Sequence, residues 1–264
     1  MIGPPFRLKV AEWTSSSSGL SFGMPSAEDV KTWYNQHYAA KGLQSMRPAA
    51  AYPVFLDLLD ARPGTHLLDV SCGAGSLLAA AQDRGIEAVG VDLSDEAVRL
   101  AKRVAPTAEV AVGAGEALAF RDRTFDYVTC LGSLEHFLDM GQGLEEMKRV
   151  AKADARFCIM VPNQDFIGWR VLGHQGTAQQ DINEHLLPLT TWRRLFEQHD
   201  LSVLRVVPDF WHAIRWRASD GGKRGLARFV IGPVLEVGWR LVPLRWQYQF
   251  VFVLANRSTP PTSP

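Results

Sequence analysis

From residue 67 onward, short apolar runs alternate with segments in which apolar residues recur every three or four positions. The runs, bounded by Gly, Asp and Pro, predict buried strands, and the periodic segments predict amphipathic helices. We expect strands at residues 67–70, 86–92, 108–112, 125–131 and 155–161, and helices at residues 76–84, 95–104 and 141–152. Strands that alternate with helices in this way indicate a parallel sheet covered on both faces.

The same pattern predicts further elements on both sides of this alternation. Ser26 and Asp29 resemble a capping pair that opens a helix through about Ala40, and a second helix is expected from about Arg47 to Asp60. After the alternation we expect a helix at residues 190–199 and strands at residues 201–208 and 248–256. Residues 1–24 are rich in Ser, Gly and Pro and predict a flexible N-terminal arm.

The first strand runs into a glycine turn, in the stretch LLDVSCGAGSLL at residues 67–78. Gly73 and Gly75 form the turn, and a helix is predicted to start at Ser76. A strand, a glycine turn and a helix in this order point backbone N–H groups toward a ligand, and the glycines let that ligand approach the main chain. The stretch therefore predicts a nucleotide-binding site.

Two features indicate which nucleotide is bound. A dinucleotide-binding turn has the pattern G-x-G-x-x-G, but the third glycine is replaced here by Leu78. Asp69, inside the strand before the turn, would repel a pyrophosphate and attract an ammonium group. Asp92 ends the next strand, where it can accept hydrogen bonds from both hydroxyls of a ribose, at roughly 1.5–3 kcal/mol for each charge-assisted bond.

Four stretches together resemble the class I S-adenosylmethionine-dependent methyltransferases. They are LLDVSCGAG (67–75), VGVDLS (89–94), GAGEALAF (113–120) and FDYVTCLGSLEHF (125–137), each at the end of a predicted strand. The resemblance covers about residues 30–207 and the last strand. It implies a Rossmann-like α/β fold with a seven-stranded, mostly parallel sheet, helices on both faces and an antiparallel last strand. It also implies S-adenosyl-L-methionine as cofactor and S-adenosyl-L-homocysteine as product.

The resemblance assigns cofactor contacts to residues near the strand ends. These are Tyr38, Asp69, Ser71, Cys72, Gly73, Gly75, Asp92, Leu93, Ala114, Gly115, Glu116, Leu131 and Gly132. Tyr38 is expected to reach the methionine carboxylate or to shield the sulfonium, although its helix could instead pack its rings on the sheet. The third stretch departs from the family pattern, with Ala114 in place of an aspartate and Ala119 in place of a proline. Backbone groups of residues 113–116 must therefore contribute more to adenine recognition.

Two insertions interrupt the predicted methyltransferase core, which comprises residues 25–208 and 248–257. Residues 163–189 and 209–247 are expected to form a helical cap over the substrate site. The second insertion is interpreted as a substrate lid, with plain packing and contact with a membrane surface or a second copy as alternatives. Its charged residues prevent it from spanning a bilayer. Six of the eight tryptophans follow residue 165, which favours a small or amphipathic acceptor, apolar or lipid-linked molecules included.

Two histidines are candidates for the general base of methyl transfer, with O-methylation favoured. His136 follows the fourth sheet strand, and His185 belongs to the first insertion. Imidazole has a suitable pKa near neutrality, but a structural role for each ring, or a cofactor-positioning contact for His136, is the alternative. Glu135 beside His136 is interpreted as an acid at the pocket rim, a buried salt bridge or a helix cap. The histidines show no recognised metal-ligand spacing.

Composition limits the remaining function classes. The chain has 264 residues, 47% of them hydrophobic, with 28 Lys and Arg and 28 Asp and Glu, so no net charge is present to attract nucleic acid. Cys72, Cys130 and Cys158 are expected to be reduced and buried, and the absence of a signal-peptide pattern indicates a cytoplasmic protein. Two alternatives stay open: a non-catalytic protein that binds S-adenosylmethionine or S-adenosylhomocysteine, and a nicotinamide-dependent oxidoreductase. Sequence leaves the oligomeric state open.

Overall fold

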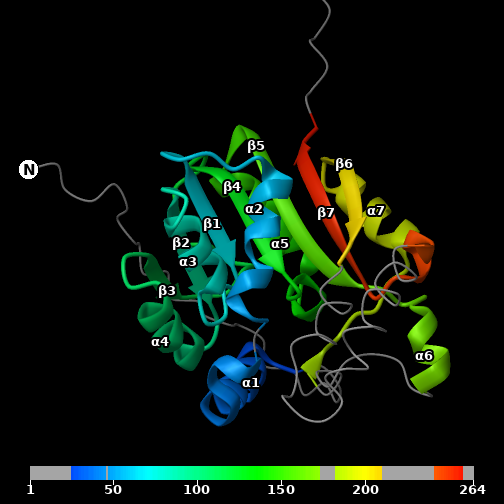
Figure 1. Cartoon of the computed structure of the whole chain (residues 1–264), viewed down its shortest axis with the longest axis horizontal. Coiled ribbons are helices and arrows are strands. Elements are labelled where there is room, and N and C mark those ends of the chain that lie inside the picture. Colours follow the sequence, from blue (N-terminus) through cyan, green and yellow to red (C-terminus); the bar gives the residue numbers. More distant parts are fainter. Residues whose placement is uncertain (1–24, 46, 173–181, 210–240, 258–264) are drawn as a thin grey trace, which may run out of the picture.

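The computed structural model describes residues 25–45, 47–172, 182–209 and 241–257. Within these ranges, seven strands form one sheet in the order β3-β2-β1-β4-β5-β7-β6 (Figure 1). The strands are β1 (His66–Val70), β2 (Glu87–Asp92), β3 (Glu109–Val112), β4 (Phe125–Leu131), β5 (Ala151–Pro162), β6 (Leu201–Pro208) and β7 (Gln249–Asn256). Each strand predicted from the apolar runs is therefore present.

The strand directions agree with the predicted fold class. β1 pairs in parallel with β2 and β4, β2 with β3, and β4 with β5. β7 is antiparallel to both of its neighbours, β5 and β6. These directions confirm a Rossmann-like, mostly parallel sheet with an antiparallel last strand, and they bring the carboxyl ends of β1, β2 and β4 to one edge.

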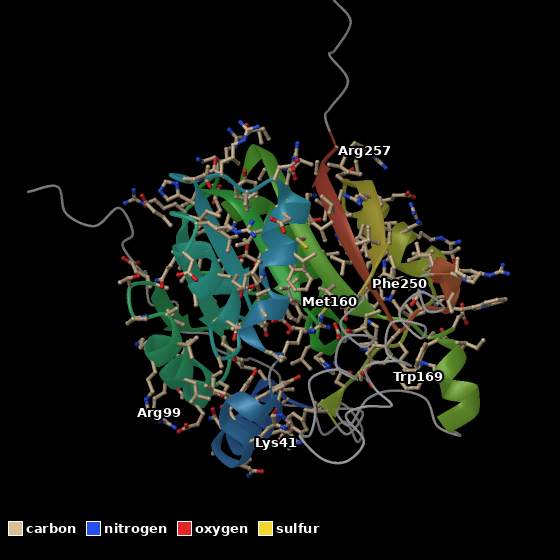
Figure 2. All side chains as sticks on the ribbon, in the orientation of Figure 1. Lys41, Arg99, Met160, Trp169, Phe250 and Arg257 are labelled. Carbon is tan, nitrogen blue, oxygen red and sulfur yellow. The ribbon has the colours of Figure 1, made fainter. Side chains whose placement is uncertain are left out.

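Helices cover the two faces of the sheet and bury two separate apolar clusters. One face carries α2 (Pro53–Leu59), α3 (Ser76–Gln82) and α4 (Asp95–Val104), and the other carries α5 (Met140–Val150) and α7 (Leu189–Gln198). Leu67 and Leu68, consecutive in β1, belong to opposite clusters, as the period of a strand requires. Figure 2 shows Met160 and Phe250 in the interior and Arg99 and Arg257 at the periphery.

Two predicted boundaries were wrong. The helix expected from about Arg47 begins only at Pro53, after a short 3-10 turn, η2 (Ala49–Ala51). Proline lacks an N–H group and is favoured at the first position of a helix, so α2 starts there. β5 begins at Ala151 and not at residue 155, because α5 ends at Val150 and the chain enters the sheet directly.

The helix α1 (Ala27–Lys41) lies beyond the carboxyl ends of the central strands (Figure 1). Its predicted capping pair is present: Asp29 N–H donates to Ser26 Oγ at 3.2 Å, and Ser26 N–H donates to Asp29 Oδ2 at 2.8 Å. The chain then passes through η1 (Gly42–Ser45) toward α2. On the same side of the sheet are η3 (Leu134–His136), α6 (Ile167–Leu172) and η5 (Leu244–Trp246).

Parts of the predicted domain organisation lie outside the described residues. These parts are the arm at residues 1–24, residues 173–181 of the first insertion and residues 210–240 of the second. Within the described part of the chain, no helix has the length and apolar character needed to cross a bilayer.

Close packing of α3 on β2 depends on Gly90. A Cβ atom at this position would lie 2.7 Å from Leu78 Cδ1 and 2.8 Å from Cys72 Sγ. We expect Gly90→Ala to lower the free energy of unfolding by about 1–3 kcal/mol, because α3 must move away from the sheet. Denaturant unfolding measures this change. Gly113→Ala, which would contact Val91 Cγ1 at 3.1 Å, is the matched control with a smaller expected loss.

The double variant Gly90→Ala/Leu78→Ala tests whether contact with Leu78 causes this loss of stability. Its loss of stability should be smaller than the sum of the two single losses, because removing the leucine makes room for the new methyl group. Additive losses would show that the contact between these two positions is not what limits packing.

Candidate active site

The turn after β1 has the backbone conformation that its glycines permit. Gly73 and Gly75 have φ values of +54° and +79°, and Ser71 has a φ value of +58°. The α3 helix follows directly, and a Cβ atom at Gly75 would lie 2.9 Å from Ala101 Cβ on α4. The turn is therefore folded tightly against α4, with its backbone at the carboxyl edge of the sheet.

Asp92, at the end of β2, holds this turn in place. Its Oδ2 accepts a hydrogen bond from Gly73 N–H at 2.8 Å, and its Oδ1 accepts one from Ser94 N–H at 2.9 Å. Burial raises the pKa of Asp92 to about 6, and the two backbone donors oppose that rise. A carboxylate oxygen can accept more than one hydrogen bond, so Asp92 retains the capacity to bind two hydroxyls of a ligand.

Asp69, in β1, is a second buried acid at the same edge. Its Oδ1 accepts a 2.6 Å hydrogen bond from Thr129 Oγ1 on β4. Burial raises the pKa of Asp69 to about 7, and the charge of Asp92 adds to that rise. The structure thus brings the two predicted acids close enough to interact, and Thr129 is a partner that the sequence did not indicate.

The helix α1 is attached over this edge by polar contacts with the start of α4. Ser94 Oγ donates to Asn35 Oδ1 at 2.7 Å, and Lys31 Nζ forms a 2.9 Å ion pair with Asp95. Tyr38, predicted to contact the cofactor, lies close to Asp92: burial raises the pKa of its hydroxyl well above the ordinary value, and Asp92 contributes. The Tyr38 hydroxyl on α1 is therefore buried near Asp92.

The remaining predicted contacts differ in what their side chains do. Cys72 lies in the apolar cluster with α2 and α3, so only its backbone is available to a ligand at the turn. Glu116 Oε1 accepts a hydrogen bond from Leu138 N–H at 3.0 Å, which occupies its carboxylate within the protein. A Cβ atom on Gly115 would lie 2.3 Å from Phe137 Cζ, so this loop packs too closely for a side chain. Ala114 is partly exposed beside it.

The remaining candidates lie at the ends of β2 and β4. Leu93 directly follows Asp92 and is partly exposed. Leu131 ends β4, and Gly132 after it has a φ value of +72°. Leu131 and Gly132 are both partly exposed at the carboxyl edge.

The two candidate bases come from segments that meet at η3. His136 is 5% exposed, and its Nδ1 lies 3.2 Å from the carbonyl oxygen of Asn183. Its ring lies edge to face with Tyr34 of α1, at 6.3 Å between centroids. The backbone N–H of His185 donates to the carbonyl oxygen of Glu135 at 2.9 Å, which fixes the first insertion to η3.

Glu135 is the main residue whose role the sequence did not settle. Its carboxyl group is buried, with Oε1 at 4.0 Å from His136 Nε2. Burial is the main cause that raises the pKa of Glu135 to about 8. A hydrogen bond from its own backbone opposes this rise, and the charge of nearby Glu184 contributes to it. An acid beside a histidine at the carboxyl end of a strand was the available signal, but burial cannot be seen in the sequence.

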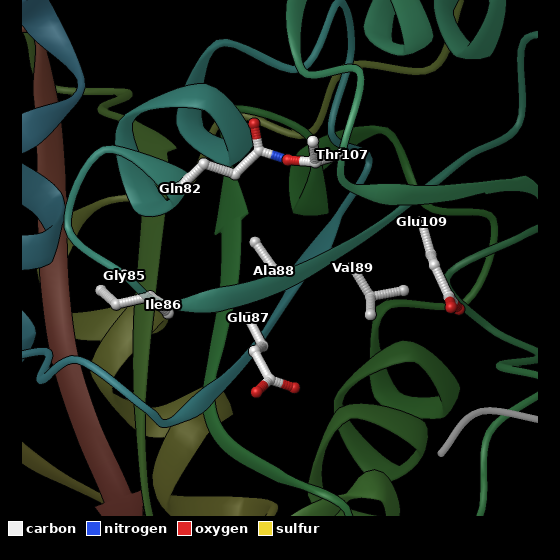
Figure 3. A pocket seen from close by; sticks show the side chains of 8 residues that line it. All are labelled: Gln82, Gly85, Ile86, Glu87, Ala88, Val89, Thr107 and Glu109. Carbon is white, nitrogen blue, oxygen red and sulfur yellow. The ribbon is translucent and has the colours of Figure 1, made fainter. Parts of the chain in front are cut away.

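A hollow of about 370 Å³ lies elsewhere, at the amino ends of β2 and β3 (Figure 3). Glu87 and Glu109, the first residues of those strands, contribute to its wall. Ligands of parallel α/β sheets bind beyond the carboxyl ends, so this hollow is not the candidate site. Within the described residues, no three His, Cys, Asp or Glu side chains are grouped as metal ligands would be.

Comparison with known proteins gives a family match over the described core. Residues 68–159 match the family model of the methyltransferase domain. Nocamycin O-methyltransferase from Saccharothrix syringae is 36% identical over 133 residues, which cover 47% of this chain and 47% of that protein. The chain thus matches about half the length of this curated relative.

Two solved structures share the fold across most of the chain. Geranyl diphosphate C-methyltransferase from Streptomyces coelicolor A3(2), in complex with Mg²⁺, geranyl diphosphate and S-adenosyl-L-homocysteine, has a TM-score of 0.61 at 17% identity, covering 88% of this chain and 97% of that chain. The [4+2]-cyclase SpnF has a TM-score of 0.63 at 15% identity, with coverage of 88% and 97%. At these identities the likeness concerns the fold alone.

The buried acids make stability depend on pH. Unfolded Asp69 and Glu135 ionise near pH 4, but the folded protein keeps them protonated until about pH 7 and about pH 8. Their stabilising contribution is complete below the unfolded pKa and is lost as pH rises through the folded pKa. We expect the Tm of the ligand-free protein to fall as pH rises from about 4 to about 8 and to level off above that, measured by thermal unfolding.

Glu135→Gln removes the acid with the higher pKa and should flatten the upper part of this decline. A Tm that rises across the same interval, or a variant with an unchanged slope, would contradict the assignment of these two acids.

Proposed function

Because the chain belongs to the class I S-adenosylmethionine-dependent methyltransferases, as its four sequence stretches predicted, we propose that it methylates a small molecule. S-Adenosylmethionine supplies an activated methyl group on a sulfonium and leaves as S-adenosylhomocysteine. The observation that carries the proposal is the pair of buried acids, Asp69 and Asp92, beside a glycine turn that Asp92 itself holds. These residue types suit a ligand with an ammonium group and a ribose.

The residues fit such a cofactor without rearrangement of the sheet. Asp92 would accept the ribose hydroxyls with its remaining lone pairs, and Asp69 lies where an ammonium group would lower its pKa and keep it ionised. The backbone at Gly73 and Gly75 would approach the methionine portion. Tyr38 would close the site from α1. With Ala114 in place of an acid, backbone groups of residues 113–116 would recognise the adenine.

His136 is proposed as the base that takes the proton of the acceptor. Its Nδ1 faces the Asn183 carbonyl oxygen, which can only accept a hydrogen bond, so Nδ1 carries the proton of the neutral ring. Nε2 is then the basic nitrogen. Alignment of acceptor and methyl group supplies much of the rate, and the base adds to it. His185 remains the alternative base from the same side of the site.

The acceptor is proposed to be a small or amphipathic molecule, with O-methylation preferred. An O-methyltransferase and a C-methyltransferase both occur among the compared proteins, and they do not decide which atom accepts the methyl group. The histidine proposed as base, His136, is the feature that favours an oxygen nucleophile, because an oxygen nucleophile benefits from a general base. Residues 209–247 are proposed as the lid of the acceptor site, most of which lies outside the described residues. A cytoplasmic location is proposed as well.

A second candidate function is a protein that holds the cofactor without methyl transfer. Ala114, which stands in place of an acid in the third stretch, supports this candidate. Calorimetry with S-adenosylmethionine and S-adenosylhomocysteine, followed by a methyl-release assay, separates the two. Turnover supports the methyltransferase, and binding without turnover on any acceptor supports the alternative.

Asp92→Ala should weaken binding of S-adenosylmethionine by at least about tenfold, because two charge-assisted hydrogen bonds and the support of the turn are lost. Isothermal titration calorimetry gives the Kd. Glu87→Ala, at the exposed opposite end of the same strand, is the control and should leave the Kd unchanged. An Asp92 variant that binds as tightly as the wild type would remove this acid from the cofactor site.

His136→Gln should lower kcat by about 100-fold or more while the Kd of S-adenosylmethionine stays the same, because only proton removal is affected. Steady-state methylation kinetics measure both effects. His199→Gln, an imidazole bound to Glu145 away from the site, is the matched control. Full activity in the His136 variant would show that another group is the base.

A further inference from the structure

Glu135 carries a buried oxygen that accepts no hydrogen bond from the described residues. The residue is 3% exposed, and its Oε2 accepts no hydrogen bond from the described part of the chain. Other buried acids of the site are satisfied: Asp69 by Thr129, and Asp92 by two backbone N–H groups. A buried carboxyl oxygen without a partner reduces stability, so its retention calls for a ligand that supplies the missing contact.

Glu135 lies beside the candidate base His136 in η3. It follows β4 at the carboxyl edge of the sheet, and a Cβ atom on Gly132 would lie 4.0 Å from its Oε1. Five titratable groups face it from the elements packed around it. They are Cys130 of β4, His136 of η3, Tyr34 of α1, Glu184 of the segment before α7, and Tyr248 before β7.

Aromatic rings form one wall beside this carboxyl group. Phe166, Trp169 and Tyr248 are mutually edge to face, with centroids 5.0, 5.1 and 5.6 Å apart. Glu135 is near enough to Tyr248 to raise the pKa of its hydroxyl. Tyr34 of α1 adds a further ring near this acid, edge to face with His136. A ring-bearing molecule suits such walls.

We propose that Glu135 is a specificity-determining residue whose Oε2 hydrogen-bonds a hydroxyl group of an uncharged, ring-bearing methyl acceptor. The proposal rests on the methyltransferase function proposed above and adds to it a residue and a substrate class. It assigns no proton transfer to Glu135, because His136 has that role.

The charge state of the site explains the preference for an uncharged acceptor. Burial keeps Glu135 protonated at neutral pH, and a protonated carboxyl group can both donate and accept a hydrogen bond. A hydroxyl group matches both capacities. An anionic acceptor would instead face the charge of Glu184 in a desolvated position, which is unfavourable.

Thermal unfolding of the ligand-free protein separates a ligand-facing acid from a structural one. Glu135→Met removes the unsatisfied oxygen while keeping the shape, so its Tm should rise by a few degrees. The matched control is Asp209→Asn, since Asp209 is equally buried but held by Arg47 at 2.8 Å, and its Tm should fall. A fall in both variants would mean that Glu135 is a structural acid and would overturn the proposal.

Ligand binding then tests the substrate class. The protein saturated with S-adenosylhomocysteine is titrated by calorimetry with 2-naphthol and with 2-naphthoate, which share one ring system and differ in charge. We expect 2-naphthol to bind the wild type and to bind Glu135→Met at least tenfold more weakly, with 2-naphthoate weaker than 2-naphthol on the wild type.

Equal binding of 2-naphthol to both proteins, preference for the anion, or no binding to the wild type would overturn the proposal. Failure of the proposed function is distinguishable, because it would appear as no binding of S-adenosylmethionine or S-adenosylhomocysteine at all. The Tm comparison on the ligand-free protein does not depend on either nucleoside.

Discussion

The carboxylate of Asp92 is the interaction on which the site depends. It accepts one hydrogen bond from the glycine turn after β1 and one from the backbone at the start of α4. Ser94, whose backbone N–H donates that second hydrogen bond, also caps α4 and donates from its hydroxyl to Asn35 of α1. One side chain therefore fixes the turn, and through its neighbour it fixes the helix above it. A residue placed in this way both supports the structure and can bind a ligand.

The packing beneath the turn explains how the motif works without a third glycine. In a dinucleotide-binding fold, that glycine lets the helix approach the strand. Here Leu78 occupies the position, and the close approach is provided by Gly90 on the facing strand, with Leu78 Cδ1 filling the space above it. The leucine alone is thus weaker grounds against a dinucleotide than the sequence suggested. The better argument against a dinucleotide is the pair of acids at the strand ends, Asp69 and Asp92.

The sequence predicted much of the fold because its signals are local. α4 has the predicted limits, since Ser94 caps it and its apolar positions repeat regularly, and β4 and β6 also match. The start of α2 was predictable from Pro53 but was missed. Burial of Glu135 was not predictable, because it depends on α1 and on the segment near Glu184, both far away in the chain. Local patterns place residues at an edge of the sheet but do not say which of them are buried there.

The two sides of the site differ in how their buried acids are satisfied, and this difference follows from the sheet. Asp69 and Asp92 lie in neighbouring strands, where Thr129 donates a hydrogen bond to Asp69 and two backbone N–H groups donate to Asp92. These donors partly oppose the rise in pKa that burial causes. Glu135 lies in a 3-10 turn, where burial outweighs the hydrogen bond from its own backbone N–H, so its carboxyl group stays protonated at neutral pH. A cationic nucleoside suits the first pair, and a neutral hydroxyl suits the second environment. The same sheet edge can therefore hold a charged donor and an uncharged acceptor next to each other without placing a bare charge in the apolar interior.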